Sequence, residues 1–249
     1  MRLALFQQLR RRSFAGIAIL AISVSDISSA GAEETADCWN RFFRERSVSR
    51  PVGEIATFDF VGRTFRIPTV YLSRGSPQPA LREDDAVWLL AMAPDLAPPT
   101  VEQARNFWRP SSPTVRITIF GHPRFLRGQA LLDAMVAGYG HKSQDGERDA
   151  NGYTVLRAPS PTAGSWAEIH VSPEGPDHLF HCNLDGSVPY PGCTAQRWLG
   201  GSLRLEMHFR KPLIPDYPAL NAALASFMRC ALGLVDVPGE VWPQAERRR

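Results

Sequence analysis

The sequence predicts an α+β fold in which helices cover a mainly antiparallel, disulfide-stabilised sheet. Residues 203–209 alternate apolar and polar side chains, the pattern of an antiparallel strand with one buried and one exposed face. Residues 216–232 carry apolar side chains at helical spacing. The chain also contains four cysteines, an even number that is typical of disulfide-bonded exported proteins.

The first 32 residues predict a cleavable signal peptide. Arginines precede an apolar stretch, Ala15–Val24, and Ala30-Gly31-Ala32 forms a small-x-small cleavage motif. The apolar stretch is shorter than the roughly 20 residues that span a bilayer, so we expect no stable membrane anchor. The expected location is periplasmic or secreted after cleavage near Ala32. General-secretory and twin-arginine export both remain open, because Arg11-Arg12 resembles the core of a twin-arginine signal.

The expected mature chain, residues 33–249, carries no net formal charge. The full chain has 28 Lys and Arg against 25 Asp and Glu, and residues 1–32 contain four arginines and one aspartate. Removing that segment leaves 24 residues of each sign, so we expect no nucleic-acid partner. A hydrophobic content of 44% without a low-complexity linker predicts a single α+β globular domain over residues 33–249.

The order of the elements follows from local patterns. Thr35 is expected to cap a first helix that carries Trp39 and Phe43 on one face. Residues 57–67 predict a hairpin with its turn at Val61-Gly62, and Pro68 ends its second strand. Further strands are expected at 86–92, 114–120, 153–157, 166–171, 179–184 and 202–209. Three further helices are expected: one at 100–108, one that follows Gly121-His122-Pro123 and ends near Tyr139, and one at 216–232. The last has Asp216 as its expected N-cap and Gly233 as its C-cap.

The cysteines predict two disulfides. Cys182 and Cys193 flank a turn-rich loop, so a local bridge between them closes easily, and Cys38 and Cys230 then pair by elimination. The rival interpretation is a four-thiol metal site, which the absence of any C-x-x-C pair disfavours. We therefore predict no metal site and no cofactor.

Motifs for catalysis are missing from the sequence. There is no G-x-S-x-G nucleophile elbow, no P-loop and no dinucleotide-binding glycine motif. A pair of carboxylates for glycan hydrolysis has no short signature, so Glu168, Glu83, Asp84 and Asp85 stay as undistinguished candidates. The sequence leaves the question of an enzyme open and favours a protein that is not one.

Three segments resemble parts of poorly characterised exported bacterial proteins. They are Phe58–Pro68 (FDFVGRTFRIP) followed by Tyr71-Leu72, the cysteine loop Cys182–Cys193, and the strand Leu203–Phe209. Some proteins of this group resemble periplasmic immunity proteins against toxins delivered by contact-dependent or type VI secretion. The chain departs from the pattern at Thr69-Val70, where more polar residues are expected. The resemblance implies a protein partner, namely a toxin or an envelope protein.

Two functional hypotheses follow. The first is an exported protein that binds another protein, most specifically an immunity protein that occludes a toxin. Its expected contact surfaces are loops 73–85, 140–152 and 183–192, with Tyr71, Arg82, Asp185 and Tyr190 as candidate binding residues. The alternative is an envelope hydrolase that acts on glycan or peptide through an Asp/Glu or His site. A deep pocket with His and carboxylate side chains would favour the hydrolase, and a shallow apolar surface would favour the binding protein.

Overall fold

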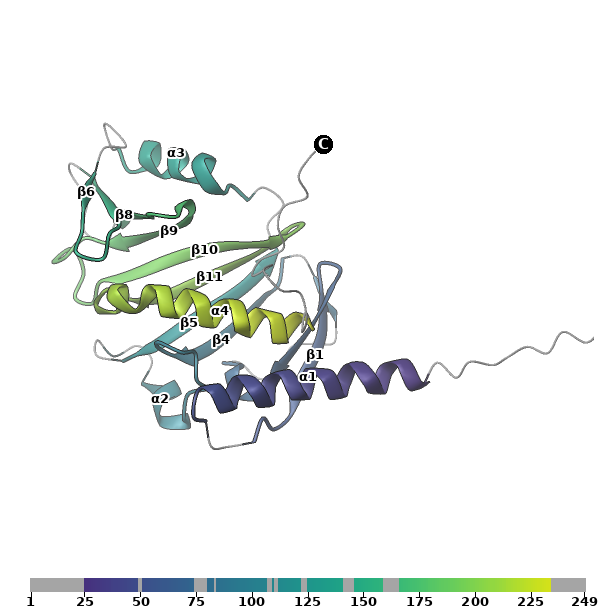
Figure 1. Ribbon diagram of the computed structural model, residues 1–249. Coiled ribbons are helices and arrows are strands. Elements are labelled where there is room, and N and C mark those ends of the chain that lie inside the picture. Colours follow the sequence, from purple (N-terminus) through teal and green to yellow (C-terminus); the bar gives the residue numbers. More distant parts are fainter. Residues whose placement is uncertain are drawn as a thin grey trace, which may run out of the picture.

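The structure is a computed structural model that describes residues 25–48, 51–73, 80–82, 84–106, 109, 112–121, 125–140, 146–158 and 166–233 (Figure 1). Two sheets and four α-helices make up this part of the chain. The helices are α1 (Ser25–Glu45), α2 (Val101–Arg105), α3 (Gly128–Gly138) and α4 (Tyr217–Leu232), and two 3-10 helices are η1 (Thr69–Tyr71) and η2 (Lys211–Asp216). These elements confirm the predicted α+β class.

A three-stranded sheet contains the predicted hairpin. Its strands are β1 (Ile55–Phe60), β2 (Arg63–Pro68) and β3 (Ala80–Leu81), in the order β2-β1-β3. Val61 and Gly62 form the turn with φ of 49° and 72°. Two successive positive φ values give a type I′ turn, whose twist matches that of the strands. Pro68 is the last residue of β2, as the sequence predicts.

An eight-stranded antiparallel sheet forms the body of the molecule, in the order β4-β5-β11-β10-β9-β8-β7-β6. Its strands are β4 (Ala86–Met92), β5 (Thr114–Gly121), β6 (Glu147–Arg148), β7 (Thr154–Arg157), β8 (Trp166–Ser172), β9 (Gly175–Asn183), β10 (Gly192–Gly200) and β11 (Leu203–Arg210). In β11 the odd-numbered residues are buried and the even-numbered ones half-buried, which confirms the predicted alternation.

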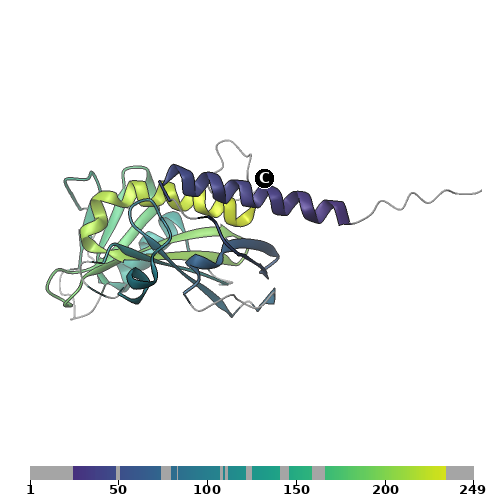
Figure 2. The same cartoon turned by 90° about the horizontal axis from the view of Figure 1, so that it is seen from below.

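Helices α1 and α4 lie side by side along one face of the large sheet (Figure 2). Aromatic rings join them: the centroid of Trp39 lies 4.9 Å from that of Phe227, and Tyr71 contacts the same ring at 4.9 Å. The disulfide Cys38–Cys230 links the two helices covalently. The second disulfide, Cys182–Cys193, joins β9 to β10, so both predicted pairings are confirmed.

Helix α3 covers the opposite face of the sheet. Leu179 of β9 packs in a small core with Leu132 and Met135 of α3, whereas the next residue, Phe180, contacts Tyr217 of α4. Successive strand residues point to opposite faces, so α3 and α4 lie on different sides of β9.

The large sheet divides between β9 and β10. The two strands pair only at Cys193↔Cys182, Thr194↔His181 and Ala195↔Phe180. Beyond Ala195, β10 continues to Gly200 with β11 as its neighbour, while the earlier part of β9 from Gly175 pairs with β8. Figure 1 shows the two strands separating in this region.

Some expected boundaries were wrong. Helix α1 begins at Ser25, so Thr35 lies inside it, buried, and is not its N-cap. Asp216 precedes α4 but makes no capping hydrogen bond with its side chain, because its backbone is already helical. Gly233 does end α4, with φ of 67°. Strand β10 was not expected at all. Residues 1–24, most of the predicted signal peptide, lie outside the described residues.

Candidate functional site

A cleft of about 1050 Å³ opens where β9 and β10 separate. One wall is the β8–β9 turn with the first half of β9 (172–174 and 176–179), and the other is Gln196–Trp198 of β10. The start of α3 at Arg127 and Gly128 lines the cleft on one face of the sheet, and α4 lines it on the other. The cleft is therefore a consequence of the short ladder between the two strands.

Arg197 lies in this cleft and is only 5% exposed. Its guanidinium contacts neutral groups: Nε and Nη2 donate to Asn221 Oδ1 at 3.1 and 3.0 Å, Nη1 donates to its neighbour's backbone oxygen, Gln196 O, at 2.7 Å, and Nη2 also donates to the Tyr217 hydroxyl. Among the described residues, no carboxylate lies within ion-pair distance of it. Buried arginines in proteins normally have an anionic partner.

The groups around Arg197 also present hydrogen-bond donors. The Tyr217 hydroxyl oxygen accepts from Arg197, which leaves its O–H free to donate. Burial raises the pKa of Tyr217, so this proton stays in place at neutral pH. Asn221 accepts through Oδ1, which leaves its NH₂ group free to donate. An arginine, a hydroxyl and an amide NH₂ in one cleft form a site for an acceptor, such as a carboxylate.

The other charged side chains that line the cleft are balanced, with two basic and two acidic residues. Arg229 lines it from α4 with a buried Nε that has no hydrogen-bond partner among the described residues, and the Arg127 guanidinium stacks 4.3 Å from the ring of Trp198. On the acidic side, Asp177 lies against Gly128 at the start of α3, and Glu174 is within 3.8 Å of His178. Burial and the charge of Arg197 lower the pKa of His178, so its ring is neutral at pH 7.

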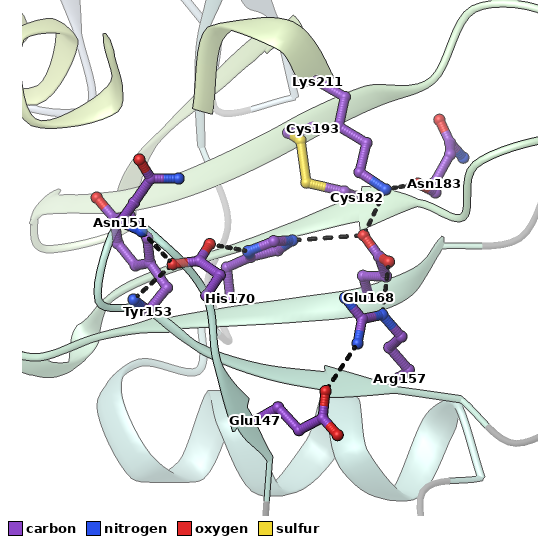
Figure 3. Close-up of polar contacts among 11 residues, drawn as sticks. Glu147, Asn151, Tyr153, Arg157, Glu168, His170, Cys182, Asn183, Cys193 and Lys211 are labelled. Carbon is purple, nitrogen blue, oxygen red and sulfur yellow. Dashed lines mark hydrogen bonds and ion pairs between the residues drawn. A yellow bond between two sulfur atoms is a disulfide. The ribbon is translucent and has the colours of Figure 1, made fainter. Parts of the chain in front are cut away.

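A second cluster of polar side chains lies beside the Cys182–Cys193 disulfide (Figure 3). Its centre is Glu168 of β8, which is 4% exposed. Lys211 Nζ lies 2.6 Å from Glu168 Oε2, and Arg157 Nε donates to Oε1 at 3.0 Å. His170 Nε2 is 3.5 Å from Glu168, and Asp149 is 3.8 Å from the other ring nitrogen of His170.

The environment of Glu168 suits a structural ion pair better than acid catalysis. Burial alone would raise its pKa, but the close contacts with His170, Lys211 and Arg157 outweigh burial and lower the pKa to about 2. A general acid in glycan hydrolysis needs a raised pKa. Of the other hydrolase candidates, Glu83 lies outside the described residues, while Asp84 pairs with Arg82 and Asp85 with a backbone N–H in a surface loop.

Among the described residues, no group of three or more His, Cys, Asp or Glu side chains could hold a metal ion. In the same part of the chain, no helix combines the length and apolar character needed to cross a membrane.

The predicted binding residues do not form one surface. Tyr71 is fully buried and its hydroxyl donates to Leu96 O at 2.9 Å, so its proposed place on a contact surface was wrong. Asp185 and Tyr190 are exposed in the disulfide loop. Arg82 is exposed beside the start of β4, and the strand registers place that start at the other end of the large sheet from Gly192.

Sequence reasoning missed the residues that gather in the cleft. Arg197, Tyr217 and Asn221 come from β10 and α4, and only the fold brings them together. A signal for Arg197 was present: it follows Cys193 and Ala195 at strand spacing and precedes Leu199, so a charged residue occupies a buried position of an alternating pattern.

Comparisons with known proteins support the fold. No protein-family model and no curated protein sequence matches the chain. A solved structure, Smlt3025, an immunity protein of the Stenotrophomonas maltophilia type IV secretion system, is similar with a TM-score of 0.50 at 15% identity, over 70% of this chain and 91% of that one. The Neisseria meningitidis iron-regulated outer membrane lipoprotein FrpD aligns with a TM-score of 0.38 at 12% identity, over 72% of this chain and 93% of that one. The chain thus has a fold similar to that of an immunity protein.

Proposed function

We propose that this protein is a periplasmic immunity protein that binds a toxin of the secretion systems of neighbouring cells and occludes it. The observation that carries the proposal is the cleft with a buried arginine that has no acidic partner among the described residues. Such a site is complete only when a ligand supplies the anion. The similarity of fold to a secretion-system immunity protein supports a protein ligand, and the two disulfides fit an oxidising compartment.

The mode of action that we propose is binding without catalysis. The Glu168 carboxylate is held ionised by its cationic neighbours, so it lacks the raised pKa of a general acid. A rigid scaffold with two covalent cross-links loses little conformational entropy on binding, which favours a tight complex.

A self-intoxication assay tests this function. The gene is deleted from its own host, and the deletion strain is co-cultured with wild-type attackers. We expect the deletion strain to lose viability only in contact with attackers that have a working secretion system. Expression of the exported protein should restore survival, whereas a form without residues 1–32 should not. Equal survival of the deletion strain under every secretion condition would contradict the proposal.

A further inference from the structure

The geometry points to the chemistry of the partner: an extended segment of the toxin enters the cleft between β9 and β10 and places an Asp or Glu carboxylate on Arg197. This inference rests on the proposed function for the identity of the partner. The carboxylate site itself rests on the contacts of Arg197 alone.

The charge of the ligand follows from the surroundings of Arg197. Arg197 as a residue is only 5% exposed, so its charge has lost most of its hydration, and its neutral partners on α4 and β10 do not replace a counter-charge. The free donors of Tyr217 and Asn221 add N–H and O–H groups that only an acceptor can satisfy. A carboxylate accepts at both oxygens, so one oxygen can take the remaining Nη1 N–H of Arg197 and the other a donor of Tyr217 or Asn221.

The expected extended conformation of the toxin segment follows from the two walls of the cleft. Pairing of β9 with β10 stops at Ala195↔Phe180, so within the described part of the chain Gln196–Gly200 has a strand neighbour only on the β11 side. Pro173 and Pro176 lie on the opposing wall, and proline lacks the N–H that would pair with a neighbouring strand. We therefore expect the incoming segment to run along β10, as in recognition by strand addition. The volume of about 1050 Å³ lies at the upper end of the range for ligand pockets, which leaves room for several residues.

The carboxylate site can be tested without the toxin. N-acetyl-glutamate diethylamide and its glutamine analogue serve as probes, titrated against the oxidised protein while the side-chain N–H resonances of arginine are followed by NMR. We expect saturable shifts of the Arg197 Nε–H with the glutamate probe, and affinity about tenfold or more lower for the glutamine analogue. No shift of Arg197, or equal shifts with both probes, would overturn the site.

The variant Asn221→Asp gives the sharpest contrast. It places a carboxylate where Asn221 Oδ1 now accepts two hydrogen bonds from Arg197, so the cation acquires an internal partner. We expect a higher melting temperature together with loss of glutamate-probe binding and of protection against attackers. Asn40→Asp, on an exposed position of α1 outside the cleft, adds the same charge and should change none of these. A stable Asn221→Asp protein that still binds the probe and protects cells would overturn the inference.

A photo-crosslinker tests the source of the carboxylate. Ala222 is exposed and lines the cleft, so a benzoylphenylalanine at this position should crosslink to the toxin during co-culture. We expect the crosslinked peptide to contain Asp or Glu. A crosslink to this chain's own residues 234–249, or to a peptide without an acidic residue, would overturn the partner assignment. If the deletion strain survives attack while the NMR shifts are present, the proposed function fails and the carboxylate site stands.

Discussion

Glu168 Oε2 and Lys211 Nζ form an ion pair of 2.6 Å in which both side chains are largely buried, at 5% and 13% exposure. The pair connects β8 to η2, the segment that leads into α4. Lys211 also lies 3.0 Å from Asp185 of the disulfide loop. One lysine therefore holds together a strand, the cysteine loop and the approach to the helix that lines the cleft.

Substitution Glu168→Gln should lower stability at neutral pH. It leaves Lys211 and Arg157 without the carboxylate that both contact, and removing one partner of a buried pair costs about 3 kcal/mol. Urea denaturation at pH 7 measures the difference. Glu147→Gln is the matched control, because Glu147 is 89% exposed and contacts the same Arg157 only at 3.8 Å. A loss of stability as large in the control would rule out this role for Glu168.

Low pH should remove the stabilisation that the Glu168 carboxylate provides, over a defined pH range. The pKa of Glu168 is about 2 in the folded protein against 4.5 for the ordinary carboxyl, so the folded state stabilises the ionised form. The contribution is fully present above pH 4.5 and disappears as the pH falls through 2. The stability gap between wild type and Glu168→Gln should shrink steadily between these values. A gap that is constant from pH 7 to pH 2 would contradict the cause that we assign.

The two disulfides should contribute unequally. Cys38 and Cys230 are separated by 192 residues and Cys182 and Cys193 by 11, which corresponds to about 5 and about 3 kcal/mol of denatured-state entropy. The double variant Cys38→Ala/Cys230→Ala should therefore show the lower denaturation midpoint. Calorimetry of both double variants measures the order, and the reverse order would indicate that the local bridge stabilises the native state directly.

Tyr71→Phe should affect stability but not binding. The hydroxyl of Tyr71 donates to Leu96 O in the core, so its loss leaves that oxygen without this donor at a cost of about 1 to 2 kcal/mol. Protection of the deletion strain should stay at the wild-type level. A stable Tyr71→Phe protein that fails to protect would return Tyr71 to the binding surface.

Val61→Asn should stabilise the hairpin. Val61 has φ of 49°, a conformation in which a β-branched side chain is strained and asparagine is tolerated. We expect a gain of about 1 kcal/mol, reduced by the packing that the valine side chain provides at the edge of the core. Val61→Ala loses that packing with less relief of strain and should be the less stable of the two. The melting temperatures of Val61→Asn and Val61→Ala, measured by thermal unfolding, test this order.

Much of the fold could be predicted because its signals are local. The alternation in Leu203–Arg210, the positive-φ turn at Val61-Gly62 and the glycine that ends α4 each depend on a few neighbouring residues. The disulfide pairing was also accessible, since one pair was close in sequence and only one pairing then remained.

The site could not be predicted because it depends on distant segments. Tyr71 follows a proline at a strand end and has the character of a surface residue, yet α1 and α4 bury it through Trp39 and Phe227. The role of Arg197 depends on its contacts with Tyr217 and Asn221. Both residues lie on α4, which is separated from β10 in the sequence by β11 and η2. Neither arrangement has a local pattern in the sequence.

The Cys182–Cys193 bridge has a consequence beyond the stability of its own loop. Only three residue pairs join the four strands β4, β5, β11 and β10 to the other four, and the bridge crosses one of those pairs. Tyr217 of α4 also contacts Phe180 of β9 and Phe209 of β11, so side-chain packing holds the two half-sheets together as well as those pairs do. The bridge adds a covalent bond to this short junction, beside the point at which the cleft opens. Reduction of the bridge should therefore weaken the junction that sets the distance between the two walls of the cleft.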